Sequence, residues 1–302
     1  MESRHSIYSQ RFFLFTSDMK LIWNLIYSSF SIWSGARSSS MAAAMTYFGM
    51  LSLAPLLVIA IAIAGSFFGD KMAQAEIIEQ VKLFTTEDIA NIIGNLMANA
   101  TTPQSGFLAG SISVAILVFG ASGVFSQLQE TFNEIWDVPD EERQGIWLTV
   151  KARLIGILMV VIAGFLLLTT LGLSTAVAAV TNLFQEIHPR IQTWLGLADR
   201  GISFLLMPLV LSLLFWLIPK AKIQWSDVWP AAMLTSLLLS LSRYLIEFYL
   251  EFSTTSEVYG AAGSLVVLLI WIYISGLILF YGAAFSRAWT ETFGSHYTGE
   301  GE

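Results

Sequence analysis

Several long stretches of this chain carry no charged side chain, and they restrict the possible folds more than any other feature. Three of them run from Ser38 to Gly69, from Leu154 to Gln185 and from Val258 to Ser286. A helix that crosses the hydrocarbon core of a bilayer needs about 20 apolar residues, because it rises about 1.5 Å per residue. In lipid the backbone must satisfy its own hydrogen bonds, and an uninterrupted apolar stretch of this length does so as a helix. The sequence therefore predicts a helical membrane protein.

Composition agrees with this prediction and narrows the functional classes. Charged residues make up 12% of the 302 residues, and hydrophobic residues make up 55%. Soluble domains carry about 25% charged residues, so part of this surface is expected to face lipid. The formal net charge of −7 argues against nonspecific attraction to nucleic acid. The absence of cysteine excludes disulfides, thiolate catalysis and cysteine-based metal sites.

Six segments are apolar enough to span a membrane. They are residues 41–68, 107–125, 154–181, 201–219, 228–250 and 263–286. The predicted fold class is all-α, with one polytopic membrane domain over residues 41–286 that forms a bundle of six transmembrane helices. Residues 1–40 are expected to form a cytoplasmic amino-terminal region with an interfacial helix, and residues 287–302 a cytoplasmic tail.

The basic residues predict the orientation of these spans, because cytoplasmic loops carry an excess of Lys and Arg. One side of the bundle holds ten of them: Arg4, Arg11, Lys20, Arg37, Arg143, Lys151, Arg153, Lys220, Lys222 and Arg287. The other side holds Lys71, Lys82, Arg190 and Arg200. Both termini are therefore expected on the cytoplasmic side.

Three connecting stretches have helical periodicity. Residues 19–33 place Ile22, Trp23, Ile26, Phe30 and Trp33 on one side, which predicts a helix in the inner membrane interface. Residues 124–136 predict an inner amphipathic helix. The outer connection, residues 69–106, is long enough for a helical hairpin with apolar residues along both arms.

The fifth span contains three ionisable residues at helical spacing. Arg243, Glu247 and Glu251 follow one another at intervals of four residues and share one helical face. A charge at membrane depth costs about 2.5–3.5 kcal/mol on insertion scales, so such residues often have a function. The functional hypothesis is a substrate-binding site in which Arg243 engages an anionic group. The alternative is an Arg–Glu pair that neutralises itself.

Other candidate residues concern the shape of the bundle. Pro55 interrupts the first span and frees a backbone carbonyl, which makes it a candidate hinge. Ser52 and Tyr47 on the same span, and Gly260 and Gly263 at the start of the last span, are further candidates for shaping a hinge or cavity. Small residues also allow helices to pack closely in lipid, and packing is the alternative explanation for their clusters.

Signatures of enzymes are missing from the sequence. His5, His188 and His296 lie in separate connections or tails, none in a spacing typical of metal ligands. No GxSxG elbow and no Gly-rich phosphate loop before a helix is present. The sequence predicts no catalytic residue, no metal and no cofactor, and we do not expect an enzyme.

Several motifs are distributed over roughly residues 35–287. They are Ala42-Ala43-Ala44-Met45-Thr46-Tyr47-Phe48, Leu51-Ser52-Leu53-Ala54-Pro55-Leu56, Phe125-Ser126-Gln127-Leu128-Gln129, Asn133-Glu134-Ile135-Trp136, Pro219, Trp225-Ser226-Asp227, Val258-Tyr259-Gly260-Ala261-Ala262-Gly263 and Leu269-Ile270-Trp271-Ile272-Tyr273. Together these segments resemble the YihY/virulence factor BrkB family of bacterial inner-membrane proteins. The resemblance implies six helices in a bacterial inner membrane. Some members have carried a ribonuclease BN label, and others are described as transporter-like.

One position departs from the family pattern. The last span of the family usually continues as Gly-Ala-Glu, whereas Gly282-Ala283 is followed here by Ala284. Either the role of that glutamate is absent from this chain, or Arg243 pairs differently.

The leading functional hypothesis is transport or handling of an amphiphilic or anionic substrate, such as a phospholipid, in the cell envelope. Membrane lipids are then the expected partners, and nucleic acid is not. The alternative is a membrane scaffold that holds an envelope protein through the outer loop. Ribonuclease activity is not expected, because RNA hydrolysis needs a metal cluster or an acid–base pair beside a basic groove. The oligomeric state is not predicted.

Overall fold

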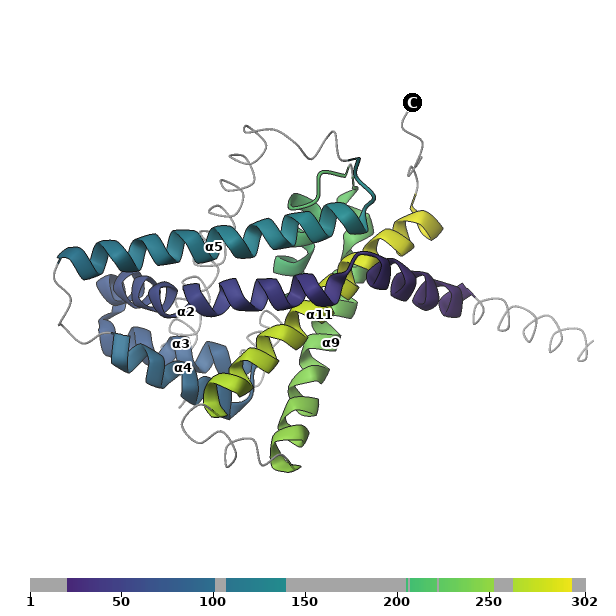
Figure 1. Ribbon diagram of the computed structural model, residues 1–302. Coiled ribbons are helices and arrows are strands. Elements are labelled where there is room, and N and C mark those ends of the chain that lie inside the picture. Colours follow the sequence, from purple (N-terminus) through teal and green to yellow (C-terminus); the bar gives the residue numbers. More distant parts are fainter. Residues whose placement is uncertain are drawn as a thin grey trace, which may run out of the picture.

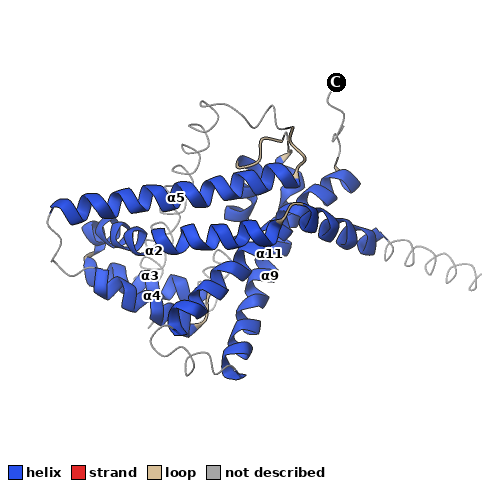
Figure 2. Ribbon diagram, viewed as in Figure 1, coloured by secondary structure: helices blue, strands red, loops and turns tan. Residues whose placement is uncertain are grey.

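The structure is a computed structural model that describes residues 21–100, 107–139, 205, 207–221, 223–252 and 263–294. Every secondary-structure element in these residues is a helix (Figure 2). The predicted third span, residues 154–181, lies outside the described residues, as do Gly260 and the first 20 residues.

The helices are long, and most follow the predicted segments. They are residues 21–35, α2 (Ser38–Phe68), α3 (Asp70–Phe84), α4 (Glu87–Ala100), α5 (Phe107–Ile135), Met207–Leu217, α9 (Trp225–Phe252) and α11 (Gly263–Phe293). The predicted segments 107–125 and 124–136 form one continuous helix, α5. The last helix extends beyond the predicted span as far as Phe293.

Three helices are long and apolar enough to cross a membrane. The candidate spans are Ser38–Val58, Trp225–Tyr249 and Leu265–Phe293, while Met207–Leu217 is a shorter apolar helix. They fall within the predicted first, fifth and sixth spans or overlap them closely. The prediction of an all-helical membrane protein is confirmed for the described part, whereas a total of six spans is not established there.

Helix α2 lies at the centre of the described structure, between α5 on one side and the α3–α4 pair on the other (Figure 1). Glycines allow the close approach of its neighbours. A Cβ atom added at Gly120 of α5 would lie 2.7 Å from Ser52 Cβ and 3.0 Å from the Phe48 carbonyl oxygen. One added at Gly276 of α11 would lie 2.8 Å from Met45 Cε. At Gly120 this supports the packing explanation, since a side chain would meet the backbone of α2, whereas at Gly276 the flexible end of Met45 would have to move.

Two apolar clusters hold the helices together. The first, here called the junction cluster, centres on Phe132, Phe215 and Phe280. The ring centroid of Phe132 lies 5.8 Å from that of Phe215 and 6.1 Å from that of Phe280. The junction cluster joins the helix of residues 21–35, the start of α2, the end of α5, the helix Met207–Leu217, the first half of α9 and the second half of α11. Ala284 is fully buried within it, so a glutamate here would place an ionisable group in an apolar core.

The second group, here called the hairpin cluster, packs α3 and α4 against the second half of α2 and the start of α11. Its buried members are Leu57, Ile61, Ile77, Ile89, Ile93, Met97, Val267 and Leu268. The connection predicted as a helical hairpin thus contains two helices that share an apolar core with two long helices. We refer to α3, α4 and the turn between them as the hairpin.

Candidate functional site

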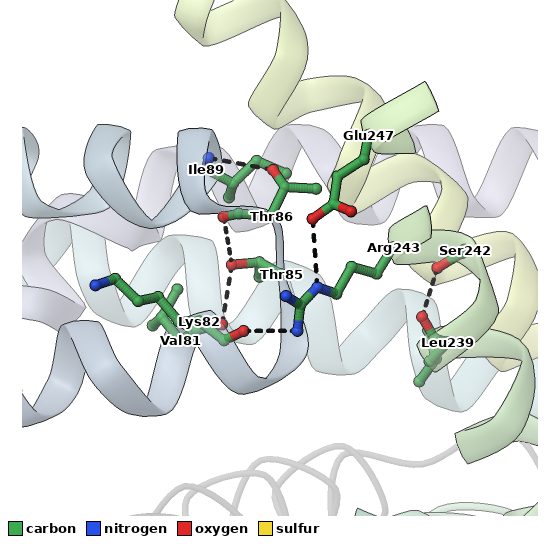
Figure 3. A network of polar contacts seen from close by, with 9 residues as sticks. All are labelled: Val81, Lys82, Thr85, Thr86, Ile89, Leu239, Ser242, Arg243 and Glu247. Atoms are coloured by element: carbon green, nitrogen blue, oxygen red, sulfur yellow. Dashed lines mark hydrogen bonds and ion pairs between the residues drawn. The ribbon is translucent and has the colours of Figure 1, made fainter. Parts of the chain in front are cut away.

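Arg243 lies in α9, inside the candidate span Trp225–Tyr249, and reaches across to the hairpin. Its Nε atom lies 3.5 Å from Glu247 Oε1, one turn further along the same helix. Its Nη1 atom donates a hydrogen bond of 3.0 Å to the carbonyl oxygen of Lys82 (Figure 3). The predicted Arg–Glu pair is therefore present, and the cation has a second partner on another helix.

The carbonyl of Lys82 is available because it lies in the last turn of α3. The final carbonyl groups of a helix have no partner within the helix and carry its partial negative charge. The neighbouring carbonyl of Val81 accepts hydrogen bonds from Thr85, from the backbone N–H and from Oγ1, both at 2.9 Å. Arg243 supplies a donor for Lys82 and places a cation at the negative end of α3.

The turn that follows α3 is buried and closed by its own side chains. Thr85 and Thr86 are both almost completely buried. Thr86 Oγ1 accepts a hydrogen bond of 3.4 Å from the N–H of Ile89, which caps the start of α4 (Figure 3). Arg243 therefore contacts an ordered turn whose geometry is fixed locally.

The side chain of Lys82 takes no part in the contact with Arg243, which uses the Lys82 backbone. Its ammonium donates to Glu79 Oε1 at 2.8 Å. This hydrogen bond and the charge of Glu79, with a smaller effect of Glu87, raise the pKa of Lys82 above its ordinary value, and desolvation opposes the rise. The ammonium is thus already matched by a carboxylate.

Arg243 retains hydrogen-bonding capacity within the described structure. A guanidinium has five N–H donors. Nε is buried and has no hydrogen bond among the described residues, although it lies within ion-pair distance of Glu247. The side chains of Arg243 and Glu247 are 34% and 42% exposed. The chemistry of this site is that of a fork of donors suited to an oxyanion, with a carboxylate that competes for it.

Two of the remaining predicted binding and shaping residues lie wholly or partly outside the described part. Glu251 lies near the end of α9, but its side chain is outside the described part, and Gly260 is outside it as well. Gly263 is the first residue of α11 and is buried.

Pro55 lies inside α2, which continues as a helix from Ser38 to Phe68. Ser52 donates to the Gly49 carbonyl at 3.1 Å and faces Gly120 of α5. Tyr47 is 61% exposed. No hydrogen bond or ion pair among the described residues links these positions to Arg243, and a hinge at Pro55 stays a prediction.

A second arginine repeats the same arrangement at the other end of the structure, and the sequence-based prediction missed it. Arg287 Nη1 donates to the carbonyl of Ile135, the last residue of α5, at 2.7 Å. Its Nε atom donates to Glu291 at 2.6 Å, and Nη2 lies 4.0 Å from Asp137 Oδ2. The shared signal is an arginine with a glutamate four residues later.

Further polar contacts fix this end of the structure. Asn133 Oδ1 accepts a hydrogen bond of 3.0 Å from the N–H of Lys220. Trp33 Nε1 donates to the carbonyl of Leu277 at 3.2 Å, which ties the helix of residues 21–35 to α11. These contacts link elements far apart in the chain, and we interpret them as structural. In the described part of the chain no three His, Asp or Glu residues are grouped so that they would hold a metal ion.

Comparisons with known proteins give a consistent result. The family profile described as Virulence factor BrkB matches residues 29–302. A UPF0761 membrane protein of Albidiferax ferrireducens is 26% identical over 252 residues, which are 80% of this chain and 56% of the relative. A UPF0761 membrane protein of Kangiella koreensis is 23% identical over 82% of this chain and 58% of the relative.

A protein of Bacillus subtilis named as a putative ribonuclease-like protein, YfkH, is 24% identical over 84% of this chain and 90% of its own length. The chain thus spans a little over half the length of the two UPF0761 relatives and nearly the whole of the third. No solved structure matches this chain.

Proposed function

The chain belongs to the virulence factor BrkB family of membrane proteins, and on that premise we propose that it binds and moves an amphiphilic anionic molecule, such as a phospholipid. We place it in a bacterial inner membrane as a multi-pass protein with both termini in the cytoplasm. The chemistry of Arg243 and the distribution of basic residues support this proposal. No catalytic step is assigned to it.

The observation that carries the proposal is the guanidinium of Arg243 within an apolar span. Among the described residues it donates a hydrogen bond to the Lys82 carbonyl and lies 3.5 Å from Glu247 in an ion pair. Nε is buried, but the side chain as a whole is one-third exposed, so we expect an oxyanion to approach from its exposed part. Phosphate and carboxylate groups fit these donors because the planar guanidinium binds two oxygen atoms at once.

The neighbouring carboxylates have defined roles in this proposal. Glu247 holds the guanidinium in place while the site is empty and competes with the incoming anion. Glu251 lies one turn further along the same face of α9 and orients the head group. An acid beside the binding cation also keeps affinity moderate, which suits a protein that must release what it binds.

The test is retention of anionic lipid by purified protein. Arg243→Gln should reduce the amount of anionic phospholipid that stays bound in native mass spectrometry by about tenfold, since a lost charge-assisted hydrogen bond is worth about 1.5–3 kcal/mol. The matched control is Lys71→Gln, which removes an exposed cation from α3 with the same change in net charge. Equal retention by the two variants and the unaltered protein would remove Arg243 as the binding residue.

The alternative function, a scaffold for an envelope protein, has one observation in its favour. The hairpin presents an exposed polar face that includes Glu87, Asp88, Asn91 and Asn95. If this face is the functional one, replacing Glu87 and Asp88 by Lys should abolish complementation of a deletion strain. Arg243→Gln should then complement fully.

Ribonuclease activity, which the name of the Bacillus subtilis relative indicates, is a third candidate function, and we do not adopt it for this chain. The proposal predicts that purified protein, freed of contaminating nucleases, leaves RNA intact. The proposal would be contradicted if RNA-degrading activity co-purified with the protein and were absent from a variant that still folds.

A further inference from the structure

Helix α9 is held in different ways at its two ends. In its first half Val228, Ala231, Ala232 and Thr235 are buried in or beside the junction cluster, where Gly282 of α11 meets Thr235. In its second half the large side chains are mostly exposed: Leu237, Leu241, Tyr244, Leu245, Phe248 and Tyr249. The described structure therefore packs the first half of α9 firmly, whereas in the second half Ile246 is buried among large side chains that are mostly exposed.

The hairpin has the opposite distribution of contacts. Ile77, Ile89, Ile93 and Met97 are buried against α2 and α11 in the hairpin cluster. Towards α9, the hairpin makes the hydrogen bond between the Lys82 carbonyl and Arg243 (Figure 3). Apolar packing thus ties the hairpin to α2 and α11, while a charged side chain ties it to α9.

These two observations lead to one proposal about how the structure changes when it binds. We infer that Arg243 is a latch: it holds the hairpin against the second half of α9, and an oxyanion that takes the guanidinium releases the two from each other. Glu247 keeps the guanidinium on this side of α9 while the latch is closed. The release step depends on the proposed function, whereas the latch itself does not.

The direction of the change follows from the relative strengths of the contacts. A hydrogen bond from a cation to a neutral carbonyl is weaker than one to a phosphate oxygen, because both partners are charged in the second case. An anion bound at Arg243 therefore competes well with Lys82. Buried apolar contacts do not respond to the anion, so α3 and α4 should stay on α2 and α11 while α9 separates from them.

The chain contains no cysteine, so pairs of spin labels can be placed without removing native residues. One pair joins the hairpin to α9, at Asn91 and Leu245, both exposed. The control pair joins the hairpin to α11, at Asn91 and Leu265, and the hairpin cluster lies between these two helices. Distances are measured by pulsed electron paramagnetic resonance in nanodiscs of neutral lipid.

The first arm tests the latch without any anion. Arg243→Met should broaden the distance distribution between residues 91 and 245 and move it outward, and leave that between 91 and 265 unchanged. Arg243→Lys, which keeps a donor and the charge, should restore much of the narrow distribution. An unchanged 91–245 distribution in Arg243→Met would overturn the latch, and a change in both pairs would show general loosening and overturn it too.

The second arm tests release in the unaltered sequence. Nanodiscs with phosphatidylglycerol test a lipid head group, and inorganic phosphate added to neutral nanodiscs tests a free anion. Either one should broaden the 91–245 distribution, and the one that does so identifies the source of the anion. If native mass spectrometry shows anionic lipid bound and the distribution stays narrow, release is wrong although the proposed function holds. If no anion binds, the proposed function fails, and the first arm alone decides the latch.

Discussion

Arg243 and Arg287 each supply a hydrogen-bond donor and a positive charge to carbonyl groups at the end of another helix. Each donates to a carbonyl at the end of another helix, Lys82 in α3 and Ile135 in α5, and each has a glutamate one turn later. Carbonyl groups at a helix end favour a cation because the helix dipole is negative there. The two arginines differ in exposure, since the side chain of Arg287 is 20% exposed and has three partners.

This difference predicts a structural role for Arg287. Arg287→Ala should lower the free energy of unfolding by about 1–3 kcal/mol, because it leaves the Ile135 carbonyl and Glu291 without their donor. Thermal unfolding in detergent, followed by tryptophan fluorescence, measures the loss. Arg37→Gln is the matched control, since Arg37 is 69% exposed and 3.6 Å from Glu134, and such pairs contribute about 0–1 kcal/mol. Equal losses in both variants would contradict the assignment.

Lys82 provides a prediction about pH. Its pKa is raised by the hydrogen bond and charge of Glu79, so its stabilising contribution is complete below the ordinary value of 10.5 and is lost as the pH rises through the higher folded value. Glu79→Gln should bring the pKa of Lys82 back towards the ordinary value, as measured by NMR of labelled lysine side chains. The contact with Arg243 should persist, because it uses the Lys82 backbone. Loss of the narrow 91–245 distribution in Glu79→Gln would contradict this separation.

The sequence identifies Arg243 and Glu247 but not what Arg243 binds on the hairpin. Four-residue spacing on one helix predicts the pair directly. The Lys82 contact joins positions 161 residues apart through a backbone carbonyl. Every residue has such a carbonyl, so no residue type marks it in the sequence. The contacts of Arg287 are not predicted from the sequence for a related reason. Arg287 follows an uncharged span, and in sequence it cannot be told from any basic residue at a membrane boundary.

At the scale of helices, periodicity predicts which segments are helical better than which faces are buried. In the second arm of the hairpin, the apolar residues Ile89 and Ile93 are buried. In the first arm Ile77 is buried, and Ile78 and Val81 pack at the edge of the hairpin cluster. The hairpin packs against α2 and α11, and its two arms also pack against each other, so its apolar residues occupy more than one face of each helix. A single apolar stripe along a helix does not describe that arrangement.

The helix of residues 21–35 differs from the core helices in a consistent way. Its predicted apolar stripe includes Ile22, Trp23, Ile26 and Phe30, and these side chains are exposed in the described structure. Leu25 and Ser29, which lie on the face next to this stripe, are buried. Exposure of the stripe is the arrangement that an interfacial helix needs, and its position in a membrane stays a prediction.

The crossing of α2 and α5 predicts the effect of a single methyl group. Gly120→Ala should destabilise the protein by about 1–3 kcal/mol, because the added carbon would lie 2.7 Å from Ser52 Cβ. The midpoint of thermal unfolding in detergent measures the effect. Gly35→Ala is the control, because nothing lies within 4 Å of a Cβ placed there. If Gly120→Ala were as stable as the control, close contact at this crossing would be wrong.

At the scale of the whole molecule, the two clusters divide the described structure into two packed regions that share α2 and α11. The sequence predicts this class of protein because uncharged stretches of such length are rare outside membranes. The division itself depends on which distant helices meet. No pattern of residue types in one segment specifies its partner, and the hairpin cluster combines residues from Leu57 to Leu268.

The predicted orientation has a direct test in the same cysteine-free background. A thiol at Asn91 in the hairpin should react with a membrane-impermeant reagent added outside intact spheroplasts. A thiol at Thr292, exposed near the end of α11, should react only after the membrane is opened. The reverse pattern would show that the excess of basic residues faces outward and would place the hairpin in the cytoplasm.

The connection between α2 and α3 consists of one residue, Gly69, whose φ of 84° suits glycine. This short joint keeps the start of α3 next to the end of α2, and the hairpin cluster packs α3 and α4 against the second half of α2. A transmembrane helix tilts when its apolar length and the bilayer thickness differ. We therefore expect the hairpin to rise or sink with the tilt of α2, so that its depth responds to lipid chain length. A spin label at Asn91 whose exposure to a water-soluble relaxation agent stays constant between short-chain and long-chain nanodiscs would show that the joint does not transmit tilt.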